Sequence, residues 1–168
     1  MPTTFTKIAS VSVGVLGAAS IDFSSIPSTY TDLVLKISAR TTRVDFSDAI
    51  SLSINGSSAN QTSRYLEGGG TAAGSGSLSS FRTQASAATS TSNTFGNSEF
   101  YIPNYAGSNN KSASSDGVSE NNATSASAWL VANLWSQTAA INQLTITDLN
   151  SATFVQYTTA TLYGIKNS

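Results

Sequence analysis

The chain has 168 residues, 10% of them charged, and a formal net charge of −1. It contains no Cys and no His, which excludes disulfides, thiolate metal sites and thiol nucleophiles and removes the usual general base of neutral-pH catalysis. Eight basic residues against nine acidic ones leave no basic surface for a phosphate backbone, so we expect neither nucleic acid nor, given the short apolar runs, a membrane as partner.

The first half of the chain is predicted to form β-strands, because apolar residues recur at every second position. The expected strands are 6–16, 20–24, 32–42 and 49–54, with a stop at Pro27 and a turn over 45–48. The clearest is 32–42, where Leu33, Leu35 and Ile37 share one face. Asn55-Gly56 favours a type I′ hairpin that returns through 61–67.

The second half alternates between weak and strong strand signals. Five of the nine residues in 68–76 are Gly, which predicts a flexible loop. Residues 78–87 and 95–105 are expected to be extended, and 108–122 is expected to be a long polar loop. Residues 127–135 suit a strand or a short helical turn, and 141–147 and 158–165 are predicted strands.

Composition and pattern together predict one domain of eight to ten strands. The 31 Ser and 21 Thr residues are compatible with disorder or with exposed strand positions, and the 39% hydrophobic content favours strands. The expected fold class is all-β, an antiparallel β-sandwich of jelly-roll-like form. Residues 1–19 form either an N-terminal strand or a docking arm, and 20–168 form the β-sandwich domain.

No constellation of side chains predicts chemistry. The nine carboxylates are scattered, and only Asp45 and Asp48 lie close together in sequence, so we interpret them as turn and surface residues. A calcium site drawn from 45–48 or from Asn109-Asn110 lacks an ordered D-x-D-x-D loop. The glycines of 68–76 lack the lysine of a phosphate-binding loop. We therefore predict a protein that is not an enzyme, with no catalytic, cofactor-binding or metal-binding residues and no cofactor.

Six aromatic residues leave one binding function open. They are core residues or, alternatively, parts of a sugar-binding platform, and the core interpretation is the stronger one. The six are Tyr65, Phe100, Tyr101, Tyr105, Trp129 and Trp135.

Three segments, together about a quarter of the chain, form an ordered pattern. Residues 21–40 contain Ile26-Pro27-Ser28-Thr29-Tyr30 before an alternating strand, residues 134–146 contain Trp135-Ser136-Gln137-Thr138-Ala139-Ala140-Ile141, and the chain closes with Leu162-Tyr163-Gly164-Ile165. This set resembles small virion proteins of tailed phages, of the capsid decoration (cement) or tail-fibre module type. Residues 56–128 match that pattern only loosely.

The resemblance implies a structural role. It implies a phage virion protein located on the capsid surface, where a decoration protein binds and stabilises the lattice of the major capsid protein. The expected partners are the major capsid protein and further copies of the chain itself, as a homotrimer. The alternative is a receptor- or glycan-binding module of a phage tail fibre.

Overall fold

The computed structural model describes residues 4–122 and 125–166, which form twelve β-strands and no helix. The strands are β1 (Phe5–Ser12), β2 (Ser20–Phe23), β3 (Asp32–Ala39), β4 (Ser47–Ile54), β5 (Gln61–Gly68), β6 (Ala73–Leu78), β7 (Phe81–Ser86), β8 (Gly96–Ile102), β9 (Lys111–Glu120), β10 (Ala126–Trp135), β11 (Leu144–Asp148) and β12 (Thr159–Ile165).

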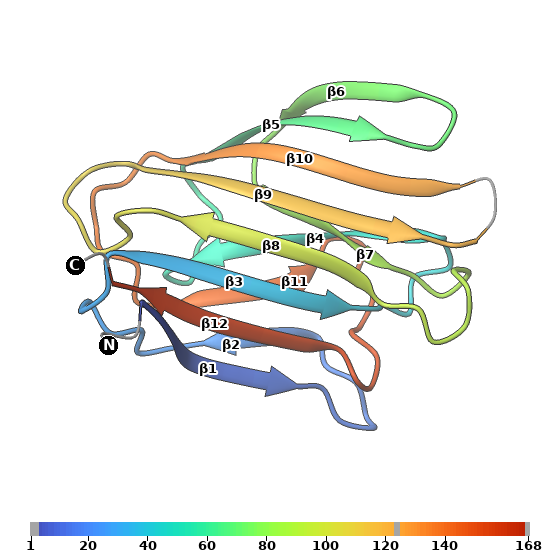
Figure 1. Cartoon of the computed structure of the whole chain (residues 1–168), viewed down its shortest axis with the longest axis horizontal. Helices are drawn as coiled ribbons and strands as arrows, with labels where there is room; N and C mark the ends of the chain where they lie inside the picture. Colours follow the sequence, from blue (N-terminus) through green and yellow to red (C-terminus); the bar gives the residue numbers. More distant parts are fainter. Residues whose placement is uncertain (1–3, 123–124, 167–168) are drawn as a thin grey trace.

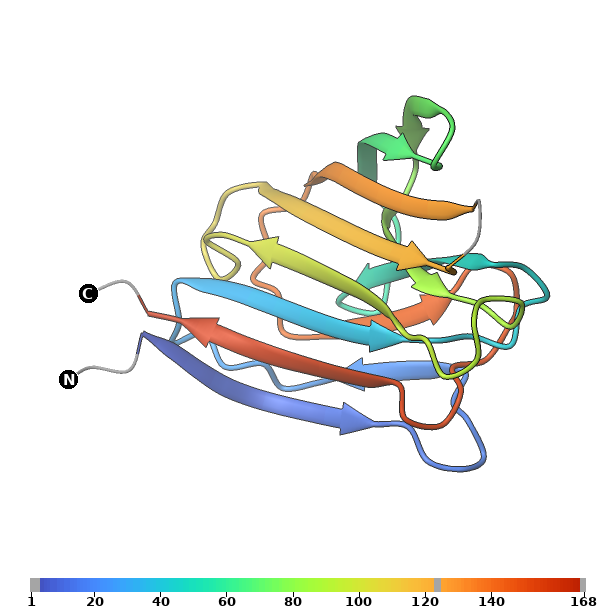
Figure 2. The ribbon, with the colours of Figure 1, turned by 45° about the vertical axis from the view of Figure 1, so that its right-hand side comes forward.

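The strands form two antiparallel sheets of unequal size. The large sheet has the order β1-β12-β3-β8-β9-β10-β5-β6, and the small sheet has the order β2-β11-β4-β7. The small sheet lies behind one face of the large sheet, and the hairpin of β5 and β6 projects beyond it (Figure 1). Figure 2 shows the same two layers turned by 45° about the vertical axis. The predicted all-β antiparallel sandwich is confirmed.

The core lies between the sheets and follows the predicted alternation. Leu33, Leu35 and Ile37 of β3 face inward and are buried, as are the inward residues of β4. The inner face also holds large aromatic side chains, including Phe81 and Phe100, and these are fully buried. Each buried aliphatic or aromatic side chain of this size contributes about 1.5–3 kcal/mol to folding, so the two-layer arrangement follows from the period-two pattern.

The N-terminal segment takes a place in the large sheet. β1 is an edge strand that pairs antiparallel with β12, with a shift in register between Lys7 and Ala9. Ile8, Ala9 and Val11 pack against the core, while the part of the segment at 1–3 lies outside the described residues. The docking arm stays a prediction, because a strand at a sheet edge is also the element that copies of a chain exchange most easily.

The turn at Asn55-Gly56 forms, but the predicted hairpin is wrong. Both residues have positive φ, 51° and 76°, and Ile54 and Ser57 exchange two backbone hydrogen bonds of 2.9 and 3.0 Å. β4 already has β11 and β7 on its two sides, so no edge is free for the returning chain. β5 instead joins the large sheet, and the Gln61 amide reaches back to the Leu52 carbonyl at 3.1 Å.

Three expected loops or turns are strands or parts of strands. The polar segment 108–122 contains β9, a ten-residue strand inside the large sheet. The Gly-rich segment 68–76 contains the last residue of β5 and the first four residues of β6, so only residues 69–72 form the connection. Asp48, expected in a turn, lies in β4 and is fully buried. The segment 127–135, whose sequence suits either a strand or a short helical turn, is part of strand β10.

Candidate functional site

The outer face of the large sheet carries an apolar area near the hairpin, bordered by two charged residues, Asp116 opposite Leu130 and Arg64 opposite Ala132. On β10 the side chains alternate, with Val131 and Trp135 buried and Leu130 and Leu134 exposed. Leu130 lies opposite Leu66 of β5, and the two side chains are 59% and 61% exposed. We call this area the outer-face patch, and its residues are Leu66, Val118, Ala128, Leu130, Ala132 and Leu134.

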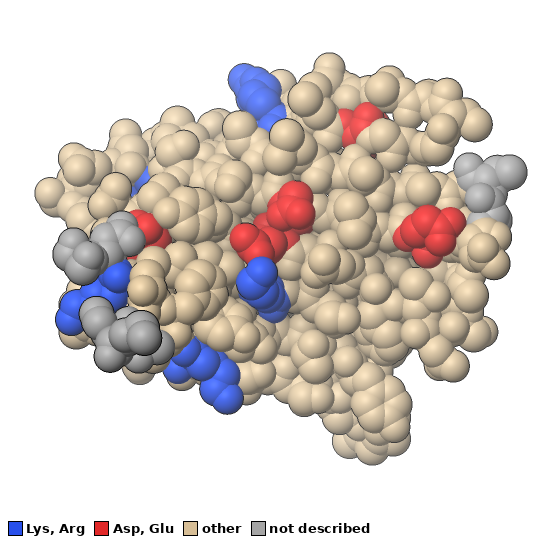
Figure 3. Space-filling view, in the orientation of Figure 1, with Lys and Arg blue, Asp and Glu red and all other residues tan. Residues whose placement is uncertain are grey.

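Few charges interrupt this face of the molecule. Figure 3 shows blue and red atoms as small islands in a mostly neutral surface. One island is the ion pair of Lys36 with Glu99, with 2.5 Å between the ammonium nitrogen and the carboxylate oxygen, and this contact raises the pKa of Lys36. A hollow of about 470 Å³ lies beside the patch, lined by Arg64, Leu66, Ser77, Leu130 and others. A partner of low charge therefore meets little desolvation cost here.

A second apolar area lies at one end of the sandwich, where three loops meet. Val15 and Leu16 in the loop after β1 are 78% and 97% exposed, Val44 in the loop after β3 is 86% exposed, and Tyr157 before β12 is 69% exposed. Backbone hydrogen bonds join the loops, since Ala18 and Phe154 exchange two of 3.0 and 2.8 Å. We call these four exposed residues the loop tip, and the loops lie at the right in Figure 1.

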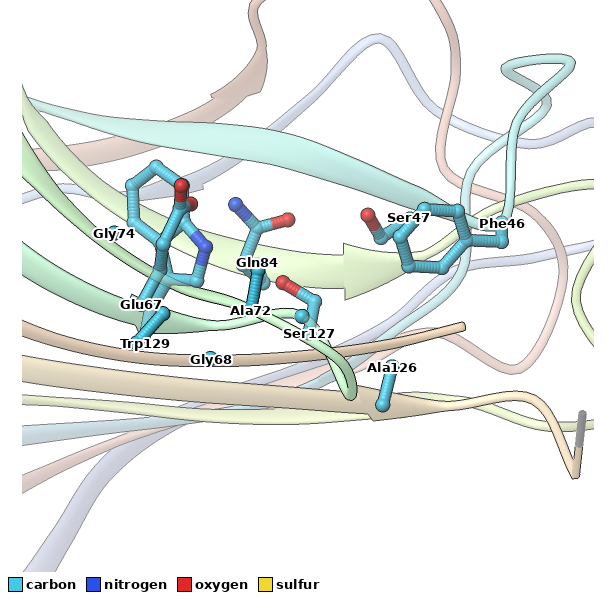
Figure 4. A pocket seen from close by; sticks show the side chains of 12 residues that line it. Phe46, Ser47, Glu67, Gly68, Ala72, Gly74, Gln84, Ala126, Ser127 and Trp129 are labelled. Atoms are coloured by element: carbon cyan, nitrogen blue, oxygen red, sulfur yellow. The ribbon is translucent and has the colours of Figure 1, made fainter. Parts of the chain in front are cut away.

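A cleft opens on the opposite, inner side of the β5–β6 hairpin. It lies between the hairpin and the edge of the small sheet and has a volume of about 330 Å³. Figure 4 shows Trp129 and Glu67 at one end of the cleft, Gln84 in the middle, and Ser47 and Phe46 at the other end. Its lining residues are Phe46, Ser47, Glu67, Gly68, Gly69, Ala72, Ala73, Gly74, Gln84, Ala126, Ser127 and Trp129.

One glycine of β6 makes room for the aromatic pair beside the cleft. Gly76 lies opposite Tyr65 in the strand pairing, and a Cβ at Gly76 would come within 2.8 Å of the Tyr65 ring. The ring of Tyr65 therefore lies over the β6 backbone, where it stacks on Trp129 with 4.5 Å between ring centroids and 8° between planes. A hydrogen bond also fixes the indole. In the orientation of the Gln84 amide that gives both its oxygen and its nitrogen a partner, Trp129 Nε1 donates to the Gln84 oxygen at 3.3 Å.

A buried pair of carboxyl groups lies apart from the cleft. Asp48 accepts hydrogen bonds from the Thr41 hydroxyl at 2.6 Å, the Asn150 amide at 2.8 Å and Arg43 at 3.2 Å. Burial, together with the neighbouring carboxyl of Asp148, raises the pKa of Asp48. Asp148 Oδ2 is buried and meets no hydrogen-bond donor among the described residues.

The six aromatic candidates divide between core and surface. Phe100, Tyr105 and Trp135 are buried, and Tyr101 lies on the outer face, where its hydroxyl donates to Asp32 at 2.8 Å. Tyr65 and Trp129 meet at the cleft. Sequence reasoning placed both residues in a set of six but had no signal for their stacking, because β5 and β10 are neighbours in the sheet and distant in the chain.

The calcium candidates do not come together as a ligand set. Asp45 accepts from the Phe46 backbone at 2.7 Å and pairs with Arg43 at 3.2 Å, which is the behaviour of a turn residue. Within residues 4–122 and 125–166, no three His, Cys, Asp or Glu side chains are placed to hold a metal ion. In the same residues, no helix is long and apolar enough to cross a membrane.

The chain was compared with protein-family models, with curated proteins and with solved structures. None of the three comparisons gives a match. Function is therefore argued from the surfaces of the fold and from the sequence pattern alone.

Proposed function

We propose that this protein is a structural component of a phage particle, a capsid decoration protein that binds and stabilises the lattice of the major capsid protein. The observation that carries the proposal is the outer-face patch, a contiguous set of exposed apolar side chains on a sheet with few charges. Soluble proteins rarely leave such areas uncovered unless they bind a partner. The resemblance of the chain's two ends to small virion proteins supports the same conclusion.

The chemistry of the surface suits a permanent lattice contact. Burying leucine side chains releases ordered water and depends little on salt, and surrounding Ser and Thr hydroxyls supply hydrogen bonds that screening does not weaken. A decoration protein holds its place by affinity and shape, and this sandwich presents a rigid face for both.

The loop tip gives the protein a second apolar surface, at a different position from the outer-face patch. A protein that bridges neighbouring capsid subunits, or that assembles as a homotrimer on the lattice, needs two such surfaces. We assign the patch to the capsid lattice and the tip to a further contact, either the next copy of the chain or a neighbouring capsid subunit. The virion surface is then the place where the protein works.

Replacing Leu66 and Leu130 together by Ser tests the capsid contact. Each side chain is about 60% exposed, so burying the pair contributes about 2 kcal/mol, and the double variant should bind about 30-fold more weakly. The measurement is co-sedimentation of purified protein with phage particles that lack it. Phe5→Ser is the matched control, since Phe5 is exposed at the other edge of the same sheet. Equal binding by the double variant and the control contradicts the proposal.

Replacing Leu16 by Ser tests the loop tip separately. Because Leu16 is 97% exposed, the melting temperature should stay within about 1 °C of the unchanged protein. Binding to particles should weaken about tenfold if one leucine is buried in the contact. Unchanged binding together with unchanged oligomeric state in sedimentation equilibrium would show that the tip makes no contact.

A tail-fibre module is the alternative, and position on the particle separates the two functions. Immunogold labelling or cryo-electron microscopy of virions should place the protein over the capsid shell. Label confined to the tail would refute the decoration role and favour the receptor-binding one.

A further inference from the structure

The cleft on the inner side of the β5–β6 hairpin has the composition of a sugar-binding site. One face of the Trp129 indole is held against Tyr65, and the indole also lines the cleft. Indole is a flat apolar surface with an electron-rich face, against which the C–H groups of a pyranose ring pack. The stack and the hydrogen bond to Gln84 fix the ring before any ligand arrives, which lowers the entropic cost of binding.

Polar groups line the rest of the cleft. The hydroxyls of Ser47 and Ser127 line the cleft and form no hydrogen bond with any residue that the structure describes. Gln84 is only 5% exposed and satisfies both ends of its amide with Trp129 and the Asp48 carbonyl. The two hydroxyls and the Glu67 carboxylate are therefore the side chains available to the hydroxyl groups of a ligand.

The charge of the lining selects the kind of sugar. Glu67 is the one charged residue among the twelve that line the cleft. Its side chain is positioned by Gly74, since a Cβ there would come within 2.8 Å of Glu67 Oε1. A carboxylate accepts hydrogen bonds from sugar hydroxyls and repels sialic acid, uronic acid, sulfate and phosphate groups.

We propose that this cleft binds a neutral saccharide, with one pyranose ring packed on Trp129 beside Glu67 and the rest of the ligand extending along the cleft toward the hydroxyls of Ser127 and Ser47. The volume of about 330 Å³ lies at the lower end of the range of small-molecule sites, which suits one or two sugar units. The site is independent of the proposed capsid contact, because Glu67 and Trp129 line the cleft while Leu66 and Leu130 line the hollow on the outer face. Sugar binding and capsid binding can therefore fail separately.

Titration of the full chain with oligosaccharides, followed by tryptophan fluorescence, tests the proposal. The chain has two tryptophans, and Trp135 is buried in the core, so a change in emission reports on Trp129. The ligands are oligosaccharides of neutral hexoses and N-acetylhexosamines, each beside its sialylated or sulfated counterpart. Neutral members should give saturable binding, and their anionic counterparts should bind at least tenfold more weakly. No saturable binding by any neutral oligosaccharide overturns the proposal.

Two variants separate the platform from the fold. Trp129→Ala should lose at least tenfold in affinity, measured by calorimetry because the reporter is removed. Ala72→Trp keeps the stacked pair intact and fills the cleft from an exposed position in the hairpin turn, so it should abolish sugar binding without lowering the melting temperature. Tyr101→Ala, which removes an aromatic residue from the outer face, is the control and should bind like the unchanged protein. Full binding by the filled-cleft variant would place the sugar elsewhere.

Glu67→Gln tests the charge selection. It keeps the hydrogen-bonding side chain and removes the negative charge, so affinity for neutral sugars should change little. Discrimination against the anionic counterparts should fall by severalfold, and an unchanged ratio would mean that Glu67 does not face the ligand.

Discussion

Replacing Gly117 by Ala is expected to destabilise the protein by about 3 kcal/mol, the upper end of the cost of overpacking a core. A Cβ at this position would lie 2.2 Å from Thr83 Oγ1 and 2.7 Å from the backbone nitrogen of Gln84. The hydroxyl of Thr83 can rotate, but the backbone of β7 cannot move without shifting the small sheet. The Thr83 hydroxyl also donates to the Asp116 carbonyl at 2.7 Å, and that bond is strained by the same shift. Urea unfolding followed by circular dichroism measures the loss.

Gly14→Ala provides the matched control. Gly14 has no atom within 4 Å of an added Cβ and does not have a positive φ, so the same substitution should change the unfolding free energy by less than about 0.5 kcal/mol. A difference of less than 1 kcal/mol between the two variants would show that β9 and β7 do not approach as closely as the structure indicates.

This close approach explains why β9 was predicted as a loop. The inward positions of β9 hold Ala113, Ser115, Gly117 and Ser119, which carry almost no apolar surface. They are small because β7 lies directly against them, and their hydroxyls bond across the gap, as Ser119 does with Ser86 at 3.0 Å. A pattern of Ser, Gly and Ala is typical of loops. The segment is a strand here because its small side chains allow β7 to pack closely against it, and the sequence of β9 alone does not show that neighbour.

Lys111 at the start of β9 is a second residue whose burial the sequence does not predict. A charged residue normally indicates exposure, yet Lys111 is 1% exposed. Its ammonium group donates to the carbonyls of Gly107 at 2.6 Å, Asn109 at 2.7 Å and Thr138 at 3.1 Å, and burial lowers its pKa. The three acceptors lie in two loops, one before β9 and one after β10. The local sequence does not predict that these loops meet around Lys111.

The parts of the fold that the sequence predicts are the strands in which apolar and polar residues alternate, because that pattern indicates which side chains are buried. β3 and β4 alternate aliphatic residues with polar ones, and their inward residues are buried as expected. The cleft could not be predicted, because it depends on which strands become neighbours. Tyr65 and Trp129 lie 64 positions apart in the chain, and the glycines of β6, one of which makes room for Tyr65, resemble a flexible linker until the strand pairing is known.

Replacing Asp148 by Asn is expected to stabilise the protein at neutral pH by about 1 kcal/mol or more. Asp148 Oδ1 accepts hydrogen bonds from the backbone nitrogens of Asn150 at 2.7 Å and Ala152 at 2.6 Å, and an asparagine oxygen keeps both. The new amide nitrogen takes the place of Oδ2, which has no donor among the described residues, and donates to the carboxylate of Asp48. A repulsive contact thus becomes a charge-assisted hydrogen bond.

The gain should depend on pH in a defined direction. Burial and the carboxyl of Asp148 raise the pKa of Asp48 in the folded state, so the folded protein holds a proton that the unfolded chain releases near its ordinary value of about 3.9. The stability that this proton supplies is fully present below that value and is lost as the pH rises through the raised pKa. Asp148→Asn removes the part of this loss that comes from the neighbouring carboxyl, while the part that comes from burial stays.

Thermal unfolding between pH 3 and pH 8 compares the two proteins. Asp148→Asn should melt about 2–4 °C higher at pH 7, because 1 kcal/mol corresponds to that shift in a chain of this size, and the difference should shrink toward pH 3. Asp148→Ala gives up both backbone hydrogen bonds and should melt lower at every pH, while Asp22→Asn, at the exposed position of β2, should show no gain. Parallel melting curves for Asp148→Asn and the unchanged protein across the whole range would mean that the carboxyl of Asp148 does not contribute to the raised pKa of Asp48.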